Sequence, residues 1–147
     1  MDSHEVKVEG RGAGFEQRVT AGSHRLVADE PARYGGGDAG PNPYDLLLAA
    51  IGSCTSMTVG LYARRKQWPL EAITVRLRHA RVHADDCADC EAPARYIERI
   101  EVTLELGGPL RAEQRQRLRE IAELCPVKKT LAGGLAIVTL LAPIAGG

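Results

Sequence analysis

The sequence is poor in aromatic side chains and has no net charge. Among its 147 residues there are one Trp, one Phe and four Tyr, and nineteen basic residues balance nineteen acidic ones. Aliphatic side chains must therefore build the core, and a broad electrostatic footprint for nucleic acid or an anionic membrane is excluded. The hydrophobic share of 44% and the charged share of 26% are those of a globular chain, which excludes disorder. The length predicts a single domain, residues 1–147.

The sequence also lacks the features of a secreted or membrane protein. The first residues, MDSHEVKVEGRG, contain neither a basic n-region nor an apolar h-region, so we expect a cytoplasmic protein. The stretch 43–62 approaches the length of a membrane span but contains Asp45 and several hydroxyl side chains, which favours a buried helix of a soluble protein. Stable disulfides are rare in the cytosol, where cysteines more often perform redox chemistry or bind metal. Four cysteines are present: Cys54, Cys87, Cys90 and Cys125.

The N-terminal half predicts a small sheet followed by a long helix. Short runs rich in Val and Thr alternate with glycine-containing turns, which is typical of an antiparallel meander; the runs are 5–10, 15–21 and 24–29. After a glycine-rich loop, Asn42 can cap free N–H groups and Pro43 suits the first helical position. Residues 46–66 then predict about six helical turns, apolar on nearly every side. Such a helix is buried on several faces, so we expect it to be the central element.

The C-terminal half predicts a hairpin, two helices and a strand. Residues 71–82 and 96–106 alternate between apolar and charged side chains, which indicates two paired strands joined by an acidic loop. Residues 111–124 predict a charged helix with one apolar stripe, formed by Leu118, Ile121, Ala122 and Leu124. Pro126 suits the start of another helix, and residues 135–141 predict a final strand. The predicted fold class is α+β.

Cys54 lies in the apolar helix, within the run GSCTS. A free cysteine in such a helix is often a small buried hydrophobic residue. However, the neighbouring Ser53, Thr55 and Ser56 are unusually polar for this helix, and a reactive thiol needs both access and hydrogen-bond donors. Both interpretations remain open on these residues alone.

Cys125 is placed next to a predicted helix N-terminus. Free N–H groups and the helix dipole stabilise a thiolate there, and Lys128 and Lys129 add positive charge. The alternative is a capping or packing role. Together with Cys54, the setting suggests a nucleophile and a resolving partner, although the sequence does not show that the two thiols meet.

A second pair of cysteines lies in the acidic loop DCADC. The order His79, His83, Cys87 and Cys90 offers imidazole and thiolate ligands of the kind that zinc prefers. On a strand, however, residues four apart lie about 13 Å apart, too far for one metal unless the chain bends. Acidic neighbours would also raise the pKa of a thiol, which argues against a nucleophile here. Zinc, a reducible disulfide and an idle pair are the three alternatives.

Two stretches carry a resemblance to a known family. They are GPNPYDLLLAAIGSCTSMT at residues 40–58, and LCPV at 124–127 with Thr130 and Leu131. Around these motifs, and over essentially the whole chain, the sequence resembles the OsmC/Ohr family of thiol peroxidases; residues 28–31 and the DCADC loop resemble an OsmC-like branch. The resemblance implies antiparallel sheets with a long buried central helix, in an intertwined homodimer with its active sites at the subunit interface.

The same resemblance implies an activity. Cys54 matches the peroxidatic cysteine and Cys125 the resolving one. The Cys54 thiolate would attack an organic hydroperoxide, with hydrogen peroxide as a second candidate, and become a sulfenic acid that condenses with Cys125 to a disulfide. No bound cofactor is implied; an external dithiol, a lipoylated protein in some members, closes the cycle. Oxidative or osmotic stress defence would be the role.

The chain departs from the family pattern near the start of the long helix. The family's activating glutamate lies ten residues before the peroxidatic cysteine, where this sequence has Tyr44 followed by Asp45. Asp45 would point about 100° further around the helix, so Glu30 is a second candidate for the carboxylate. The family's arginine comes from the N-terminal meander, and we select Arg25. Two other arginines are available there, Arg18 and Arg33.

Two further functions compete with the peroxidase. The chain could be a small-molecule or zinc-binding stress protein that uses His79, His83, Cys87 and Cys90 and lacks efficient peroxidase activity. It could also be a protein-interaction or stress-associated domain with idle thiols. We expect no nucleic-acid and no membrane partner.

Overall fold

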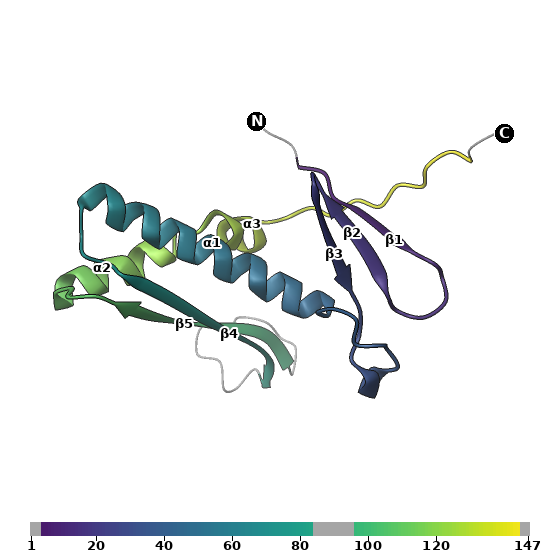
Figure 1. The fold of residues 1–147 in the computed structure, drawn as a ribbon, viewed down its shortest axis with the longest axis horizontal. Coiled ribbons are helices and arrows are strands. Elements are labelled where there is room, and N and C mark those ends of the chain that lie inside the picture. Colours follow the sequence, from purple (N-terminus) through teal and green to yellow (C-terminus); the bar gives the residue numbers. More distant parts are fainter. Residues whose placement is uncertain (1–3, 84–95, 145–147) are drawn as a thin grey trace. The chain divides into compact units, whose positions relative to one another are not determined.

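A three-stranded antiparallel sheet forms the N-terminal part of the chain (Figure 1). Its strands are β1 (Lys7–Gly10), β2 (Gln17–Ala21) and β3 (His24–Ala28), in the order β1-β2-β3. The turn between β2 and β3 contains Gly22, whose φ of 61° lies in the left-handed region that favours glycine. The glycine loop between β1 and β2 connects two strands, so the predicted meander and its hairpin turn are confirmed.

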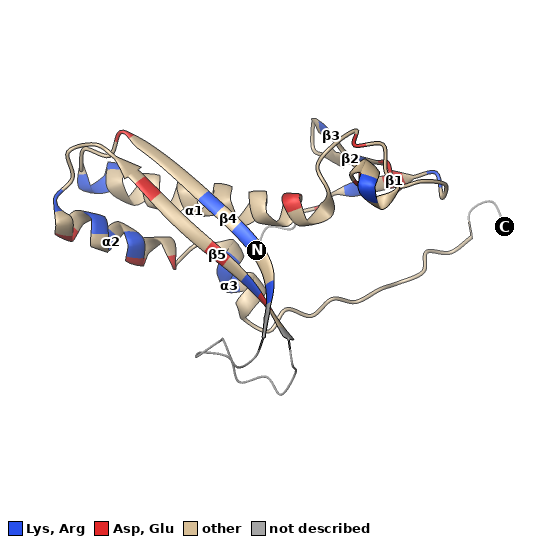
Figure 2. Ribbon diagram, turned by 90° about the horizontal axis from the view of Figure 1, so that it is seen from below, with Lys and Arg blue, Asp and Glu red and all other residues tan. Residues whose placement is uncertain are grey.

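A short loop and a reciprocal cap lead into the long helix α1 (Pro43–Lys66). Residues Ala32–Tyr34 form a 3-10 turn in this loop. The Asp45 N–H donates to the Asn42 side chain at 2.8 Å, and the Asn42 N–H donates to the Asp45 carboxylate at 3.2 Å. This exchange satisfies N–H groups that a helix start leaves free. Asn42, Pro43 and the length of the helix are as predicted, and its charges lie at its two ends (Figure 2).

Two long strands, β4 (Ala72–His83) and β5 (Tyr96–Gly107), form a separate two-stranded sheet. The structure describes residues 4–83 and 96–144, without the side chains of residues 82, 83 and 96. Side chains alternate between partly buried and exposed along both strands, as the alternating sequence predicts. The partly buried side chains include Ile73, Val75, Leu77, Val102, Leu104 and Leu106.

The helices α2 (Ala112–Ala122) and α3 (Pro126–Ala132) follow the hairpin. On α2, Leu118 and Ala122 are buried against Val59 and Ala63 of α1. The residues between the two helices end α2 and place Cys125 at the N-cap of α3, directly before Pro126. Both predicted helices are confirmed, although Leu124 of the predicted apolar stripe lies beyond the end of α2 and is exposed.

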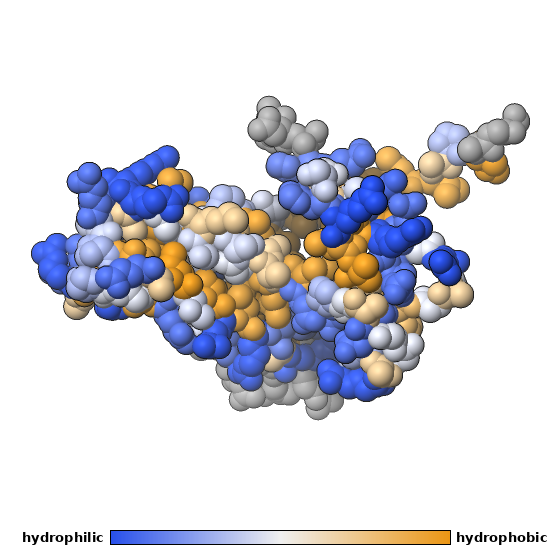
Figure 3. Space-filling model, viewed as in Figure 1, coloured by the Kyte–Doolittle hydropathy of each residue, from blue (hydrophilic) through white to orange (hydrophobic). Residues whose placement is uncertain are grey.

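The predicted final strand, residues 135–141, is wrong. This segment has no regular secondary structure, and its apolar side chains are exposed (Figure 3). Leu140 is 85% exposed and Leu141 is 99% exposed. Apolar and β-branched residues favour a strand only where another strand supplies hydrogen bonds and a packing surface. Within residues 4–83 and 96–144 none pairs with this segment.

The long helix is buried along one stripe rather than on several faces. Ile51, Thr55 and Val59 follow each other at helical spacing and are buried, whereas Met57 is 71% exposed and Leu61 is 41% exposed. By length and composition α1 could also cross a membrane, but core helices of soluble proteins pass the same test, so this is weak evidence. The apolar side opposite the stripe therefore lacks a cover within the chain as described.

Together these elements form an α+β fold of antiparallel sheets with one long helix, as predicted. The chain divides into two compact units, residues 1–52 with 76–103, and residues 53–75 with 104–147. Because α1, β4 and β5 each contribute to both units, neither unit is a continuous piece of sequence. The single domain stays a prediction.

Candidate active site

Cys54 and Cys125 lie together in the second unit, although they are far apart in the sequence. Their side chains are hydrogen-bonded to each other. Cys54 comes from the middle of α1, and Cys125 comes from the N-cap position of α3. Both are free thiols; Cys125 is fully buried, while Cys54 is partly exposed. The sequence could not show that these cysteines meet, and the structure brings them together.

Several polar groups influence the sulfur of Cys125. The backbone N–H groups of Lys128 and Val127 at the start of α3 lower its pKa, as does the Thr55 hydroxyl of α1. Thr55 is 0% exposed, so this hydroxyl lies in the interior of the unit. Burial raises the pKa of the Cys125 thiol, but the interaction with Cys54 and these polar groups outweigh burial and leave the pKa below its ordinary value.

The pKa of the neighbouring Cys54 is shifted in the opposite direction, above its ordinary value. Burial raises the pKa of Cys54, and the hydrogen bond with Cys125 raises it further. The Val127 N–H and the Thr58 hydroxyl also contact the Cys54 sulfur and lower its pKa, but they do not cancel the increase. Opposite shifts in two hydrogen-bonded thiols are expected when the groups share a proton.

The positive charge nearest in sequence to Cys125 is held in place by the end of α2. Lys128 Nζ donates to the Ala122 carbonyl oxygen at 3.3 Å and lies 3.6 Å from a Glu123 carboxylate oxygen. Its side chain is 19% exposed, whereas that of Glu123 is 68% exposed. A lysine ammonium interacts favourably with the last carbonyl groups of a helix. Lys128 therefore links the start of α3, which Cys125 caps, to the end of α2.

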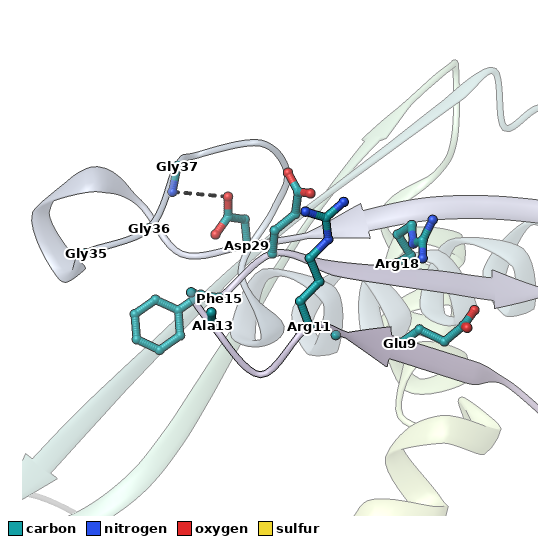
Figure 4. A pocket seen from close by; sticks show the side chains of 12 residues that line it. Glu9, Arg11, Ala13, Phe15, Arg18, Asp29, Gly35, Gly36 and Gly37 are labelled. Atoms are coloured by element: carbon teal, nitrogen blue, oxygen red, sulfur yellow. Dashed lines mark hydrogen bonds between the residues drawn. The ribbon is translucent and has the colours of Figure 1, made fainter.

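The first unit contains a second buried acceptor, Asp29, at the end of β3. Its carboxylate accepts hydrogen bonds from the N–H groups of Glu30 at 2.7 Å, Ala39 at 3.0 Å and Gly37 at 3.2 Å, the last of which is drawn in Figure 4. The bond from Ala39, followed by that from Glu30, holds the pKa of Asp29 below its ordinary value. The residue is 3% exposed. Asp29 thus organises the loop that precedes α1.

Two cavities border the three-stranded sheet. One, of about 560 Å³, is lined by Arg11, Phe15, Arg18 and Asp29 among others (Figure 4). The other, of about 590 Å³, is lined by Arg18 and Arg25. Arg25 lies opposite Thr20 across the β2–β3 pair. Arg18 therefore lines both cavities, whereas the selected Arg25 lines one.

The candidate partners of Cys54 all belong to the first unit. The Asp45 carboxylate caps α1, and the Glu30 N–H and carbonyl groups take part in the loop around Asp29. Arg25 lies on β3. Cys54 belongs to the second unit, so the assignment of Asp45, Glu30 and Arg25 as its helpers stays a prediction.

Of the four candidate zinc ligands, the structure describes the side chain of His79 alone. The ring stacks on Tyr44 at 4.8 Å between ring centroids, and its Nε2 lies 2.6 Å from a carboxylate oxygen of Glu98. Cys87 and Cys90, like the side chain of His83, lie outside the described residues. Among the described residues, three or more His, Cys, Asp or Glu side chains that could hold a metal ion do not occur together.

The hydroxyl groups of Thr55 and Thr58 are functional candidates. The sequence did not predict which thiol each hydroxyl lies near. Thr55 contacts Cys125 and Thr58 contacts Cys54. A signal was present, because Thr58 lies one helical turn after Cys54 and therefore on the same face. Thr55 points elsewhere on the helix, and no spacing rule connects it with Cys125.

Comparisons with known proteins identify a family and a fold. The family model described as OsmC-like protein matches residues 35–139. No match is found among curated proteins. The chain is similar in structure to an OsmC-like protein from Mycoplasma pneumoniae, with 15% identity, a TM-score of 0.69, and 90% of this chain and 89% of that one covered.

Organic hydroperoxide resistance proteins are among the similar structures. The one from Legionella pneumophila has 18% identity and a TM-score of 0.64, with 92% of this chain and 93% of that one covered. The one from Elizabethkingia anophelis has 19% identity and a TM-score of 0.66, with 92% and 91% covered. At these identities the likeness shows the fold.

Proposed function

Because the chain belongs to the OsmC-like protein family, we propose that it is a thiol peroxidase that reduces organic hydroperoxides to alcohols. The observation that carries the proposal is the hydrogen bond between the side chains of Cys54 and Cys125. Two thiols in contact can form a disulfide with little movement, as a peroxidatic and resolving pair requires. Relatives of the same fold named for organic hydroperoxide resistance support this substrate class.

In the proposed reaction Cys54 is the nucleophile. It is the more accessible of the two thiols, since Cys125 is fully buried. The Cys54 thiolate attacks the distal oxygen of the hydroperoxide, which breaks the O–O bond, releases the alcohol and leaves a sulfenic acid on Cys54. Cys125 then attacks the Cys54 sulfur and forms the disulfide. An external dithiol, for which a lipoylated protein is a candidate, reduces this disulfide with no bound cofactor.

The proposed site includes charged helpers from the first unit. A carboxylate, Asp45 or Glu30, and an arginine, Arg25 or Arg18, would hold the Cys54 thiolate and assist departure of the alkoxide. Arg18 is included because it lines both cavities of the sheet. Arg25→Gln and Arg18→Gln distinguish the two arginines. Substitution of the arginine that assists Cys54 should lower the rate of Cys54 oxidation by about tenfold or more.

The proposed working form is a homodimer in the cytoplasm, acting in oxidative or osmotic stress defence. The dimer is supported by the exposed apolar surface of α1 at Met57 and Leu61, and by the exposed apolar side chains of residues 135–144. Exposed apolar patches commonly mark interaction sites. Light scattering at micromolar concentration checks this, and a monomeric mass would contradict it.

The test of the activity is the consumption of cumene hydroperoxide with dithiothreitol or a lipoyl reductant. Wild-type protein should turn over, and mass spectrometry after one equivalent of hydroperoxide should find Cys54 linked to Cys125. The matched control is the double variant Cys87→Ser and Cys90→Ser, which retains the proposed pair. If Cys54→Ser keeps full activity, the proposal is wrong. Stoichiometric zinc in protein purified without added metal would instead favour the zinc-binding function.

A further inference from the structure

The helix α3 has little packing of its own, although its N-cap residue is Cys125. It is seven residues long, and within this helix, all of which the structure describes, no side chain is fully buried. A helix this short is not stabilised by its own hydrogen bonds. The residues that follow it, 133–144, are exposed and have no regular secondary structure, so they do not anchor it. The position of α3, and with it that of Cys125, therefore depends on contacts at its start.

Ala122, the last residue of α2, is the fixed point to which the start of α3 is tied. Ala122 is 3% exposed and lies in the core cluster with Val59 and Ala63 of α1. Its carbonyl oxygen accepts a hydrogen bond from the Cys125 N–H at 3.4 Å and another from Lys128 Nζ at 3.3 Å. One carbonyl group thus joins the backbone of Cys125 and the side chain of Lys128 to a residue that packs on α1.

The hydrogen bond from Lys128 is the stronger of these two ties. The backbone bond, at 3.4 Å, is longer than the usual range for N–H donors and holds Cys125 weakly. The Lys128 donor is charged, and an ammonium group interacts favourably with the last carbonyl groups of a helix. Its side chain is mostly buried, so water screens the interaction only in part. The exposed carboxylate of Glu123, at 3.6 Å, adds less.

We propose that Lys128 is a positioning residue for the disulfide step. Its ammonium group holds Cys125 within reach of Cys54 through the Ala122 carbonyl oxygen. This inference rests on the proposed peroxidase function. The sequence predicted that Lys128 adds positive charge next to the Cys125 thiolate, whereas its ammonium group is directed to a carbonyl group. The two thiols contact each other while this tie is in place, so the disulfide can form without its release.

The step that Lys128 assists is the closure of the disulfide. Peroxide attack leaves a sulfenic acid on Cys54, and Cys125 then attacks the Cys54 sulfur. The S–S bond forms, the S–O bond breaks, and the departing hydroxide combines with the proton of the Cys125 thiol to give water. No further oxidant is needed. Because the step is intramolecular, its rate depends on the effective concentration of one sulfur at the other. Lys128 raises this concentration by restricting the movement of α3.

The first test measures the effective concentration without peroxide. Protein with Cys87→Ser and Cys90→Ser is equilibrated with glutathione and glutathione disulfide, which oxidises the remaining dithiol and becomes two glutathione thiols. Lys128→Met removes the ammonium group and keeps an unbranched side chain. The equilibrium constant for disulfide formation should fall about tenfold, which raises the reduction potential of the pair by about 30 mV. An unchanged constant in Lys128→Met would overturn the proposal.

Lys129 offers a matched control for this substitution. It carries the same charge one residue along the helix and is exposed, whereas Lys128 is partly buried. Lys129→Met should leave the equilibrium constant within about twofold of the wild-type value. An effect of Lys129→Met as large as that of Lys128→Met would show that positive charge near the thiols, rather than the tie to Ala122, is responsible, and would overturn the positioning role.

The second test separates disulfide closure from peroxide attack. After one equivalent of cumene hydroperoxide, Lys128→Met should form the Cys54 sulfenic acid at the wild-type rate, and its conversion to the disulfide should slow about tenfold. Equal slowing of both steps would indicate a general loss of structure and would overturn the positioning role. Lys128→Arg keeps a charged donor and should restore most of the closure rate. Closure as slow as in Lys128→Met would contradict a role for the charge.

The third test distinguishes the two partners of Lys128. Glu123→Gln removes the exposed carboxylate and should change the glutathione equilibrium by less than about twofold. A change as large as that of Lys128→Met would assign the tie to the ion pair and overturn the role of the Ala122 carbonyl group. The glutathione equilibrium needs no hydroperoxide, so it tests Lys128 even in a protein that fails to reduce hydroperoxides, a failure that would remove only the proposed function. Conversely, an active peroxidase with normal closure in Lys128→Met would remove only this inference.

Discussion

The Asp29 loop and the thiol pair are two buried acceptor sites built on the same principle, with different consequences. Asp29, in the first unit, has its carboxylate surrounded by three backbone N–H groups. Cys125, in the second unit, has two backbone N–H groups and a hydroxyl around its sulfur. Both sets of donors lower the pKa of the buried group. However, only Cys125 is hydrogen-bonded to a second group that can take or give a proton.

Because of this difference, Asp29 is an anion with a structural role, whereas Cys125 can take part in a reaction. A carboxylate at neutral pH is already ionised, so further stabilisation of its charge adds only to the stability of the loop. A thiol ordinarily ionises near pH 8.5, so the same donors decide whether it is charged at neutral pH. The Cys54–Cys125 contact then makes the location of one proton depend on small differences between the two sulfurs.

The largest expected effect is on the thiol pair. Cys54→Ser should lower hydroperoxide reduction by at least about a thousandfold, because a serine hydroxyl cannot replace a thiolate as the nucleophile. Thermal unfolding should change little, since Cys54 is partly exposed and the substitution is small. Steady-state consumption of cumene hydroperoxide and a melting curve check the two parts. A large loss of stability in this variant would make the thiol structural, like Asp29.

The second effect is expected in the core that holds the thiol pair. Leu118 is 0% exposed and packs with Val59, Ala63 and Ala122. Leu118→Ala removes buried methyl groups and leaves a cavity, so it should lower the free energy of unfolding by about 2–5 kcal/mol. Denaturant unfolding measures this loss. The exposed Leu124→Ala is the matched control, and a loss as large as that of Leu118→Ala would contradict this assignment of the core.

Much of the architecture followed from local signals. Asn42 and Pro43 mark the start of α1 because capping acts within one helical turn. The hairpin followed from alternation, since one face of each strand is partly buried. Residues 135–141 show the limit of such signals. Their composition favours a strand, but a strand needs a partner edge, and sequence does not reveal which surface supplies it.

The site was predictable in its residues but not in its geometry. The small polar neighbours of Cys54 and the Pro after Cys125 indicated two reactive settings. Their contact depends on how α1 packs against the connection between α2 and α3, which is a long-range property. The role of Asp29 was not foreseen either, because its donors come from a glycine-rich loop whose path no periodic pattern describes.

The third effect is expected at Asp29. Asp29→Asn keeps the size of the side chain but replaces one acceptor oxygen with an NH₂ group, which cannot accept from the loop N–H groups. The variant should be less stable than wild type at neutral pH, because buried donors lose their partner. The ionisation of the thiol pair should not change. Melting curves measure the stability, and ¹³C chemical shifts of the cysteine Cβ atoms followed against pH measure the thiol ionisation. A shifted thiol ionisation would contradict the expectation that Asp29 does not influence the thiol pair.

The pH dependence of this effect has a defined sign. The folded pKa of Asp29 is lowered, so its contribution is present above the unfolded value of about 4 and is lost as pH falls through the folded value. Wild-type stability should therefore fall more steeply than that of Asp29→Asn below about pH 4. Parallel acid-unfolding curves for the two proteins would show that the Asp29 hydrogen bonds do not stabilise the ionised form.

The smallest effect is expected at Glu98, an exposed carboxylate. It tests whether burial determines how much a carboxylate with a lowered pKa stabilises the protein. Its pKa is also lowered, first by the hydrogen bond with His79 and then by Arg81. However, the Glu98 side chain is 53% exposed, and water and salt screen such pairs. Glu98→Gln should therefore shift the melting temperature less than Asp29→Asn does, and the difference from wild type should shrink further in high salt. A destabilisation by Glu98→Gln equal to that by Asp29→Asn would mean that a lowered pKa, rather than burial of the carboxylate, determines its contribution.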